Sequence, residues 1–378
     1  MGLKNIANRI WHFIKNETVL SVAVILAVIS SFFITPDIEY LNYIDFRTLG
    51  LLFCLMTVMA GLQKTGVFGF MAENLLKRIH STKSLIFILI MLCFFFSMLI
   101  TNDVALITFV PFTLTVLDML GGDVKDKTII PVVAMQTVAA NLGSMLTPIG
   151  NPQNLYLHGI SGLGVGEFML LMLPYTVISF ALLSAWALLR KGKGDVKISF
   201  NEKTRIKKKG KVVIYSTLFC VCLITVAHAL DYRVMLLVVI ATTAAADYRI
   251  FARVDYTLLL TFIAFFVFIG NMGRIPMFSN YINRIINGRE CITGILSSQL
   301  ISNVPAALLL SGFTDNIRPL IVGVNIGGLG TLIASMASLI SFKYIGRENK
   351  SLRGRYLFYF TVVNVVFLAV LFAAYYAI

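Results

Sequence analysis

Charged residues are scarce in this 378-residue sequence, and acidic residues are the scarcer kind. Only 13% of the residues are charged, with 18 Asp and Glu against 32 Lys and Arg, whereas 58% are hydrophobic and the mean hydropathy is +0.86. Since a soluble domain carries about 25% charged residues, this composition excludes an ordinary soluble protein. It is typical of a polytopic membrane protein in a lipid bilayer.

Cysteine and histidine are also few. The five cysteines lie in or beside apolar runs without metal-ligand spacing, so we expect small buried side chains and no disulfide framework. The four histidines are scattered, and no Ser-His-Asp order, inward carboxylate pair or Walker lysine can be assembled. We therefore expect no enzyme, no cofactor and no metal beyond a possible Na+.

Long apolar runs predict an all-α protein with about nine transmembrane helices. The runs are residues 19–34, 46–63, 128–157, 168–190, 212–230, 234–252, 255–272, 318–342 and 355–377. Two further apolar regions, 85–120 and 291–317, are interrupted by a polar tip, and we interpret them as re-entrant hairpins. Residues 1–18 alternate cationic and apolar residues and predict a cytoplasmic interfacial helix.

Loop charge orients these segments. Nine Lys or Arg lie between Lys191 and Lys211, the strongest cytoplasmic signal in the chain. That loop lies inside only if the first hairpin enters and leaves from the cytoplasm. We therefore predict a cell (inner) membrane protein with a cytoplasmic N-terminus and an external C-terminus. Because the net charge of +14 comes from such short loops, no nucleic-acid partner is expected.

Three sequence blocks recur in the same order. "IDFRTLGLLFCLMTVMAGLQKTGVF" (from Ile44) is similar to "VDYTLLLTFIAFFVFIGNMGRIPMF" (from Val254), "SMLITND" to "SQLISNV", and "NLGSMLTPIGNPQNL" to "NIGGLGTLIASMASL". This predicts a first repeat at 19–190 with an inward-opening hairpin, a linking segment at 191–233, and an inverted second repeat at 234–378 with an outward-opening hairpin. Inverted repeats around discontinuous helices are the architecture of secondary transporters.

The hairpin tips carry oxygen ligands at helical spacing. Two hydroxyls four residues apart stack on one helix face just before an asparagine: Ser97 and Thr101 before Asn102, and Ser298 and Ser302 before Asn303. Such oxygens suit a hard cation such as Na+. The alternative is that they only join or bend helices. Recurrence in both copies favours the cation site.

The run 128–157 contains the sequence "LTPIGNPQN", in which Pro148 and Pro152 remove backbone donors and Gly150 relaxes the chain between them. We expect the helix to break here, which frees carbonyls for a cation and N–H groups for an anion. The counterpart "GGLGTLIAS", from Gly327, has glycines in place of prolines. A kink without a ligand is the alternative.

By these residues the chain resembles the ion transporter superfamily, which holds sodium-coupled dicarboxylate, citrate and sulfate symporters, arsenite permeases and some sodium/proton antiporters. The resemblance runs from about residue 40 to 377. The symporters' Ser-Asn-Thr tips are matched by Thr101-Asn102-Asp103 and Ser302-Asn303-Val304. Their Gly-x-Pro-Pro-Asn-like turn is matched by residues 150–154 and more weakly by 334–338.

The resemblance implies two cation sites with the substrate between them. The implied cation-site residues are Ser97, Thr101, Asn102, Asp103 and Gly150 in one copy, and Ser298, Ser302, Asn303 and Ala334 in the other. The implied substrate-site residues are Asn102, Asp103, Thr147, Asn151, Asn154, Asn303, Val304, Thr331 and Ser335.

The resemblance also implies a mechanism: secondary active transport of a small carboxylate or inorganic oxyanion, coupled to Na+ or H+, by a homodimer. A transport domain of hairpins and broken helices would move past a scaffold, as in an elevator. A Na+/H+ antiporter or an arsenite-type efflux permease is the alternative, and an anion channel is less favoured because the tips are polar and the helices break at mid-membrane.

Asp103 departs from the symporter pattern and has three interpretations. It is a cation ligand or proton carrier, or it pairs with a cation such as Lys64, or it caps the returning helix at the positive end of the helix dipole. These roles are not exclusive.

Overall fold

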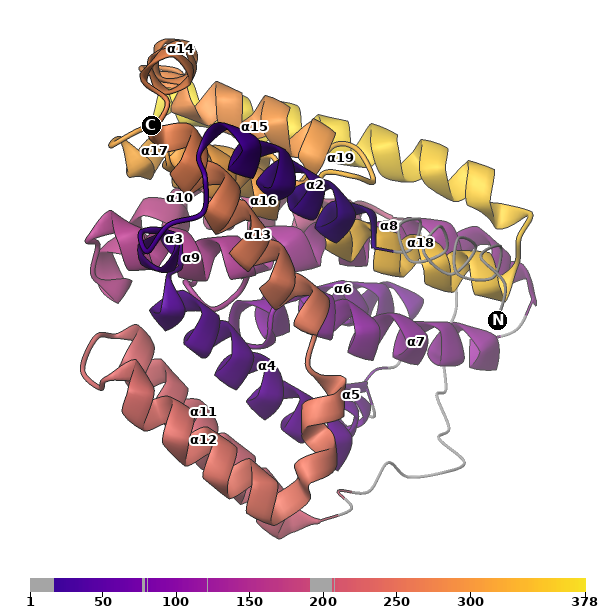
Figure 1. Cartoon of the computed structure of the whole chain (residues 1–378). Helices are drawn as coiled ribbons and strands as arrows, with labels where there is room; N and C mark the ends of the chain where they lie inside the picture. The colour runs from indigo at the N-terminus through magenta and orange to yellow at the C-terminus, as the bar shows by residue number, and fades with distance from the viewer. Residues whose placement is uncertain (1–16, 77–78, 80, 121, 191–205, 207) are drawn as a thin grey trace, which may run out of the picture.

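The computed structural model describes residues 17–76, 79, 81–120, 122–190, 206 and 208–378, so the helix expected within residues 1–18 lies almost wholly outside the described residues. The elements of the described part are helices (Figure 1). Eight are long and apolar enough to cross a membrane: α4 (Phe46–Thr65), α6 (Thr82–Ile100), α7 (Asn102–Leu120), α10 (Val165–Leu189), α11 (Lys209–Val226), α12 (Tyr232–Asp247) with η1 (Tyr248–Arg253), α13 (Tyr256–Gly273) and α19 (Leu352–Ala377).

The remaining long apolar runs form shorter or broken helices. They are α2 (Thr18–Phe33), the pair α8 (Gly122–Ser144) and α9 (Pro152–Ser161), the hairpin α15 (Glu290–Ile301) and α16 (Asn303–Ser311), and the pair α17 (Ile317–Ile326) and α18 (Met336–Glu348). Both predicted helix breaks are therefore present, at residues 145–151 and 327–335. Pro152 is the first residue of α9, where a missing N–H costs nothing.

The first hairpin is longer than a short re-entrant loop. Its helices, α6 and α7, have 19 residues each, so both also qualify as spans by length and composition. The second hairpin has helices of only 12 and 9 residues. In each hairpin a single residue, Thr101 or Ser302, separates the two helices. Both polar tips therefore lie where the sequence predicts them.

Three short helices were not expected from the sequence: α3 (Tyr40–Tyr43), α5 (Val67–Leu76) and α14 (Pro276–Ile286). α5 follows α4, and α14 follows α13. Each carries exposed apolar side chains four residues apart, namely Met71 and Leu75 on α5, and Met277, Tyr281 and Ile285 on α14. Ten or eleven residues are too few for a span, so a search for long apolar runs does not find them.

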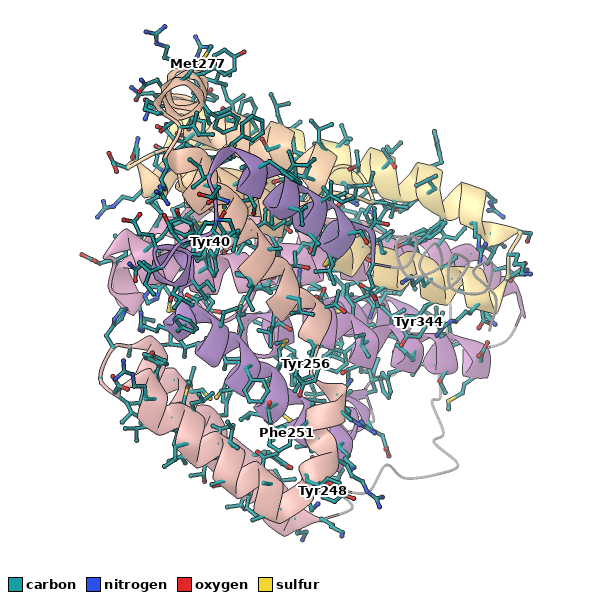
Figure 2. All side chains as sticks on the ribbon, viewed as in Figure 1. Tyr40, Tyr248, Phe251, Tyr256, Met277 and Tyr344 are labelled. Carbon is teal, nitrogen blue, oxygen red and sulfur yellow. The ribbon has the colours of Figure 1, made fainter. Side chains whose placement is uncertain are left out.

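Apolar side chains cover the outer faces of the helices (Figure 2). Leu237 on α12 is 71% exposed, and Phe358 on α19 is 75% exposed. A soluble monomer rarely exposes such continuous apolar surface, because burying it would be favourable by about 25 cal/mol per Å². These faces therefore suit contact with lipid, in agreement with the composition.

Helices α4 and α13 begin the two copies of the first repeated block, and they run in opposite directions (Figure 1). The last turn of α4 is joined to α12 by Lys64, whose Nζ lies 2.8 Å from Asp247 Oδ2. The end of α13 is joined to the loop before α4 by Arg274, whose Nη1 lies 2.7 Å from Asp37 Oδ2. Each of these matched cations therefore pairs with an acid from the segment that leads into the other helix.

The matched acids Asp45 and Asp255 begin these two helices as N-caps. Asp45 Oδ1 accepts a 3.0 Å hydrogen bond from the Thr48 N–H, and Asp255 Oδ1 accepts one of 3.0 Å from the Leu258 N–H. Their backbone angles are also nearly equal, with φ −79° and ψ 87° against φ −80° and ψ 85°. The acid recurs because a carboxylate satisfies an N–H group that the first helical turn leaves free.

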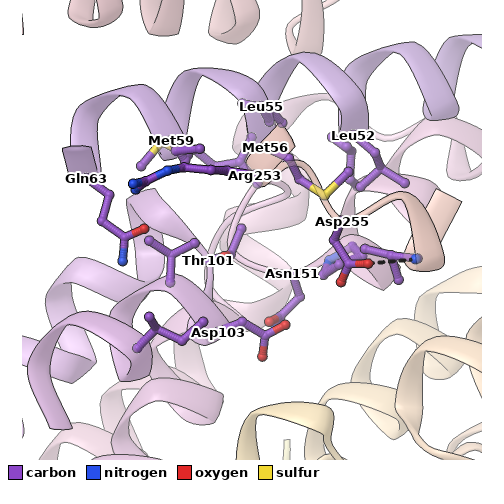
Figure 3. A pocket seen from close by; sticks show the side chains of 17 residues that line it. Leu52, Leu55, Met56, Met59, Gln63, Thr101, Asp103, Asn151, Arg253 and Asp255 are labelled. Carbon is purple, nitrogen blue, oxygen red and sulfur yellow. Dashed lines mark hydrogen bonds between the residues drawn. The ribbon is translucent and has the colours of Figure 1, made fainter. Parts of the chain in front are cut away.

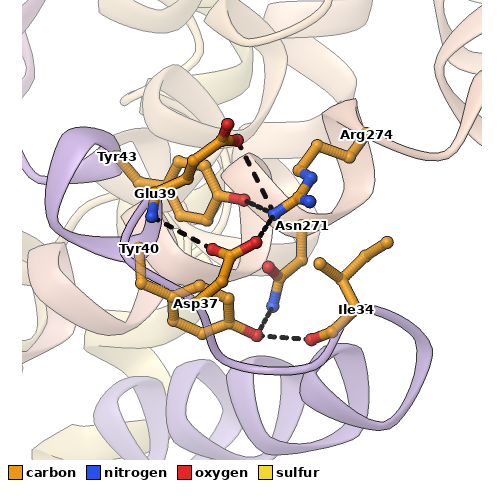
Figure 4. A network of polar contacts seen from close by, with 7 residues as sticks. All are labelled: Ile34, Asp37, Glu39, Tyr40, Tyr43, Asn271 and Arg274. Atoms are coloured by element: carbon orange, nitrogen blue, oxygen red, sulfur yellow. Dashed lines mark hydrogen bonds and ion pairs between the residues drawn. The ribbon is translucent and has the colours of Figure 1, made fainter.

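A polar network joins the α2–α3 loop to the end of α13 (Figure 4). Asn271 Nδ2 donates to Tyr40 Oη at 2.8 Å, and Tyr40 Oη donates to the Ile34 carbonyl at 2.6 Å. The Arg274 guanidinium holds the pKa of the Asp37 carboxyl below its usual range. The network fixes α2, which packs along α13, although α2 is shorter than a full span.

The hairpins pack on the broken helices through glycine. A Cβ at Gly143 on α8 would lie 2.0 Å from the Phe94 carbonyl oxygen on α6, and a Cβ at Gly323 on α17 would lie 2.4 Å from the Cys291 carbonyl oxygen on α15. Only glycine allows backbones to approach so closely. Elsewhere, α11 and α12 form a separate antiparallel pair that lies along α4 (Figure 1).

Candidate functional site

Each hairpin turns on a residue with an unusual backbone conformation. Thr101 has φ 66° and ψ 150°, and Ser302 has φ 74° and ψ 153°. With His228, they are the non-glycine residues of positive φ in the described part of the chain. Such a conformation costs of order 1–3 kcal/mol and is found mainly at functional sites, so the shared geometry marks both tips.

Each tip docks onto the break of the neighbouring broken helix. The Asn102 N–H donates to the Gly150 carbonyl at 3.2 Å, and the Asn303 N–H donates to the Ala334 carbonyl at 2.9 Å. The structure thus brings together four residues that the resemblance places in cation sites. Since a carbonyl oxygen has two lone pairs, each can accept this hydrogen bond and still face a cation.

The serine hydroxyls inside the hairpins bond to their own helices. Ser97 Oγ donates to the Phe94 carbonyl at 2.9 Å, and Ser298 Oγ donates to the Gly294 carbonyl at 2.7 Å. Both serines are fully buried, whereas the buried Oγ of Ser302 has no hydrogen-bond partner among the described residues. The oxygen lone pairs of all three remain able to accept a cation.

Asn141, near the end of α8, connects the two tip assemblies and was missed by the sequence analysis. Its Oδ1 accepts hydrogen bonds from Asn102 Nδ2 and from Ser335 Oγ, both at 3.0 Å. Its Nδ2 donates to the Gly328 carbonyl at 3.4 Å. The available signal was its position: Asn141 begins the repeated block whose second copy begins with Asn325.

Side-chain amides stabilise the first break by donating hydrogen bonds to backbone carbonyls that the broken helix leaves unpaired. Asn154 Nδ2 lies 3.3 Å from the Ser144 carbonyl, and Asn154 Oδ1 accepts a 2.7 Å hydrogen bond from Asn325 Nδ2. The Thr147 hydroxyl donates to the Met98 carbonyl. Asn151 Nδ2 donates to Ser144 Oγ at 2.7 Å, but Asn151 Oδ1 is buried without a partner among the described residues. Among these implied substrate-site residues, Asn151 therefore has a side-chain oxygen that is able to accept a hydrogen bond from a ligand or to bind a cation.

The second break depends on Gln299, another residue that the sequence analysis missed. Gln299 Nε2 donates to the Gly327 and Leu329 carbonyls, both at 2.9 Å, and Gln299 Oε1 accepts a 3.0 Å hydrogen bond from the Thr331 N–H. Thr331 itself is exposed. One hairpin side chain therefore replaces several of the intrahelical hydrogen bonds that the break removes.

A cavity of about 190 Å³ opens at the first tip (Figure 3). Its polar lining residues are Gln63, Thr101, Asp103, Asn151, Arg253 and Asp255. Asp103 and Asn151 lie next to each other, with Asp255 beyond Asn151. Asp103 Oδ1 is buried and has no hydrogen-bond partner in the described part of the chain. The volume is below the roughly 300–1,000 Å³ of pockets for drug-sized ligands, so the cavity fits a small substrate.

A second cavity, of about 280 Å³, opens beside the second tip. It is lined by Val304, Pro305, Met336 and Lys343 among others, and it shares Asp255 with the first cavity. The two tips therefore border different cavities, which have Asp255 in common. The remaining implied substrate-site residues, Asn102, Thr147, Asn154, Asn303, Thr331 and Ser335, do not line either cavity.

Lys64 does not pair with Asp103. Its ammonium binds Asp247 at 2.8 Å, as part of an ion pair at the end of α4. The interpretation of Asp103 as the structural partner of Lys64 is therefore wrong, because Lys64 pairs with Asp247 at the end of α12. Asp103 lies in the first turn of α7, as a helix-capping role requires, and it faces the cavity, as a ligand role requires.

The chain is similar to several known membrane proteins and transporters. An uncharacterized transporter of Methanocaldococcus jannaschii is 35% identical over 94% of this chain and 95% of its own length. The inner membrane protein YbiR of Escherichia coli is 30% identical over 79% of this chain and 80% of its own length. A silicon efflux transporter of Oryza sativa is 32% identical over 37% of this chain and 28% of its own length.

The family comparison covers most of the chain. The sequence model described as "Citrate transporter" matches residues 9–319, which include both tips and the first helix break. The resemblance to the ion transporter superfamily is thereby confirmed. The chain is a multi-pass membrane protein that belongs to the citrate transporter family.

Proposed function

We propose that the protein is a secondary active transporter of a small anion, a carboxylate or an inorganic oxyanion, coupled to Na+ or H+. The observation that carries this proposal is the charge of the first cavity, whose wall has two carboxylates, Asp103 and Asp255, and one guanidinium, Arg253. An anion entering this space adds to a negative excess. Since unpaired charges within a membrane protein are costly, the anion needs a cation or a proton beside it.

The proposed mechanism is an elevator movement of the hairpins and broken helices. Helices α6, α7, α8 and α18 pack together, as do α15, α16 and α17, whereas α4 packs mainly with α11 and α12, and α2 mainly with α13. The scaffold would consist of α2, α4, α11, α12 and α13, and in our proposal it also joins two copies into a homodimer. The antiparallel α4 and α13, with their exchanged ion pairs, support inverted repeats as the basis of the movement.

Flux into proteoliposomes tests this function. Citrate, succinate, sulfate and phosphate would be supplied in turn, each with and without an inward Na+ or H+ gradient. We expect saturable uptake of one anion that runs uphill only with one gradient. Conductance at channel rates, with no dependence on any cation gradient, would contradict the proposal and indicate a channel.

A second candidate is an efflux permease or a Na+/H+ antiporter, and the same cavity favours it. Because carboxylates outnumber guanidinium groups on the wall, a cation or an uncharged hydroxylated acid is a natural cargo. The relative from Oryza sativa is named a silicon efflux transporter. Arsenite and Na+ in the same flux assay, loaded inside the vesicles, distinguish this candidate from anion uptake.

A further inference from the structure

A third cavity lies away from the tips, where α4 and α12 end and α11 begins. It has a volume of about 450 Å³ and receives Lys64 from α4, Lys208 and Lys211 from the start of α11, and Arg249 from η1. Asp247 is the acid among its lining residues. Four cations therefore line the cavity against one carboxylate, and none of them lines the two cavities at the tips.

Two of the cations are held in place by Asp247. Lys64 Nζ and Lys211 Nζ lie 2.8 and 2.9 Å from the same oxygen, Asp247 Oδ2. Because one carboxylate cannot neutralise two ammonium groups, this group keeps a positive charge. Lys208 and Arg249 are exposed at the mouth of the cavity and add to it. A fixed group of positive charges of this kind is suited to binding an anion.

Tyr215 gives independent evidence for a ligand. Its ring packs so closely on α4 that a Cβ at Gly61 would lie 2.4 Å from it, and the side chain is only 1% exposed. Tyr215 lines the cavity, yet its Oη has no hydrogen-bond partner among the described residues. A buried hydroxyl normally has a partner, so an acceptor from outside the chain is expected at this point.

We propose that this cavity binds the phosphate group of an anionic phospholipid. The phosphate oxygens would accept hydrogen bonds from Tyr215 Oη and from the lysine ammonium groups. Three observations favour a lipid over a free anion: the cavity lies at the ends of three candidate spans, it follows the most basic segment of the sequence, and Ala244, Ala245 and Ala246 form an apolar part of its lining. Basic pockets between helices on the cytoplasmic side are typical headgroup sites.

Thermal unfolding of the full-length protein in neutral detergent tests the proposal. The probes are dihexanoyl phosphatidylglycerol, dihexanoyl phosphatidylcholine with the same acyl chains, and inorganic phosphate. We expect phosphatidylglycerol alone to raise the unfolding temperature with saturation. An equal effect of phosphatidylcholine would exclude recognition of the anionic headgroup, and an equal effect of inorganic phosphate would show a free-anion site in place of a lipid site.

Two variants identify the site within the chain. Lys208→Gln removes an exposed charge and should weaken phosphatidylglycerol binding about fivefold. Tyr215→Phe keeps the ring on Gly61 and should weaken binding about tenfold or more, because a hydrogen bond to a charged group is lost. Neither variant should lower the unfolding temperature without lipid. The matched controls, Lys350→Gln and Tyr281→Phe, change exposed residues on other helices or loops and should bind as wild type.

Wild-type affinity in both site variants would overturn the proposal. So would an equal loss of affinity in Lys350→Gln, because that result would show only general attraction between lysines and anionic lipid. Native mass spectrometry of the purified protein gives a second readout, since a bound phospholipid should be retained by wild type and lost from Tyr215→Phe.

Discussion

At the scale of single residues, the candidate site consists of matched pairs. Thr101 and Ser302 share a backbone conformation, and the following asparagines donate to matched carbonyls. The residues after these asparagines differ in charge. Asp103 and Val304 each line a cavity, but only Asp103 can ionise. The two tips therefore have the same framework but different chemistry, and Asp103 supplies a charge to one side only.

Replacing Asp103 by Asn removes that charge. If Asp103 carries the proton or binds the coupling cation, the variant should lose uphill transport and change its voltage dependence, because a charge that crosses the full field contributes about 2.3 kcal/mol per 100 mV. The measurement is uptake against pH, Na+ and membrane potential. Asp315→Asn, on an exposed loop, is the control. An active Asp103→Asn protein with unchanged responses would leave only the helix-capping role.

Replacing Asn141 by Ala tests the link between the tips. The change leaves Asn102 Nδ2 and the Ser335 hydroxyl without their shared acceptor, and each buried unsatisfied group costs about 1–3 kcal/mol. We expect lower thermal stability and loss of transport. The control is Asn364→Ala, because the buried Asn364 amide donates to the Phe360 carbonyl of its own helix. Normal flux in Asn141→Ala would show that the link is not needed.

At the scale of elements, hydropathy predicted the long helices, prolines predicted the first break, and glycines in the matching repeat predicted the second. In lipid, every backbone N–H and C=O group of an apolar span must be paired within the protein, so such a span forms a continuous helix. A break in that helix therefore needs residues that interrupt it, and proline and glycine are visible in the sequence. The helices α5 and α14 were missed because they are short and amphipathic. Gln299 and Asn141 were missed for another reason: their partners lie on other segments, and no local pattern reports such a contact.

The close packing of α6 on α8 gives a test at this scale. Gly143→Ala adds a Cβ that would lie 2.0 Å from a backbone oxygen of α6, so the helices must separate. Overpacking of this kind costs about 1–3 kcal/mol, and it would also move the first tip away from the break. We expect a lower unfolding temperature and reduced flux.

Gly354→Ala is the matched control for the packing test. A Cβ at Gly354 on α19 meets no atom within 4 Å, and alanine is the better helix former, so this variant should be as stable as wild type or slightly more stable. A Gly143→Ala protein with wild-type stability would mean that α6 and α8 can separate without cost.

At the scale of the whole molecule, ion pairs between distant segments join helix ends that loop charge predicts to lie on the same side of the membrane. Lys64 with Asp247 joins two predicted cytoplasmic ends, Arg274 with Asp37 joins two predicted external loops, and Lys125 bonds to Glu348 near two further cytoplasmic ends. Loop charge is read from the sequence, whereas side-chain pairing is a property of the folded structure. Their agreement supports the proposed topology, in which the first hairpin opens to the cytoplasm and the second to the outside.

Single cysteines labelled in intact cells test that topology. Of the five native cysteines only Cys220 is exposed, so its replacement by Ser leaves only buried cysteines and low background labelling. Gly166→Cys, at the start of α10, and Asp315→Cys, in the loop before α17, should react with a membrane-impermeant maleimide from outside, because the topology places both on the external side. At Gly166 there is room for a side chain. Lys350→Cys should react only after permeabilisation. Labelling of Gly166→Cys from the inside alone would contradict this topology, either because residues 85–120 cross the membrane once or because the whole chain is inserted the other way round.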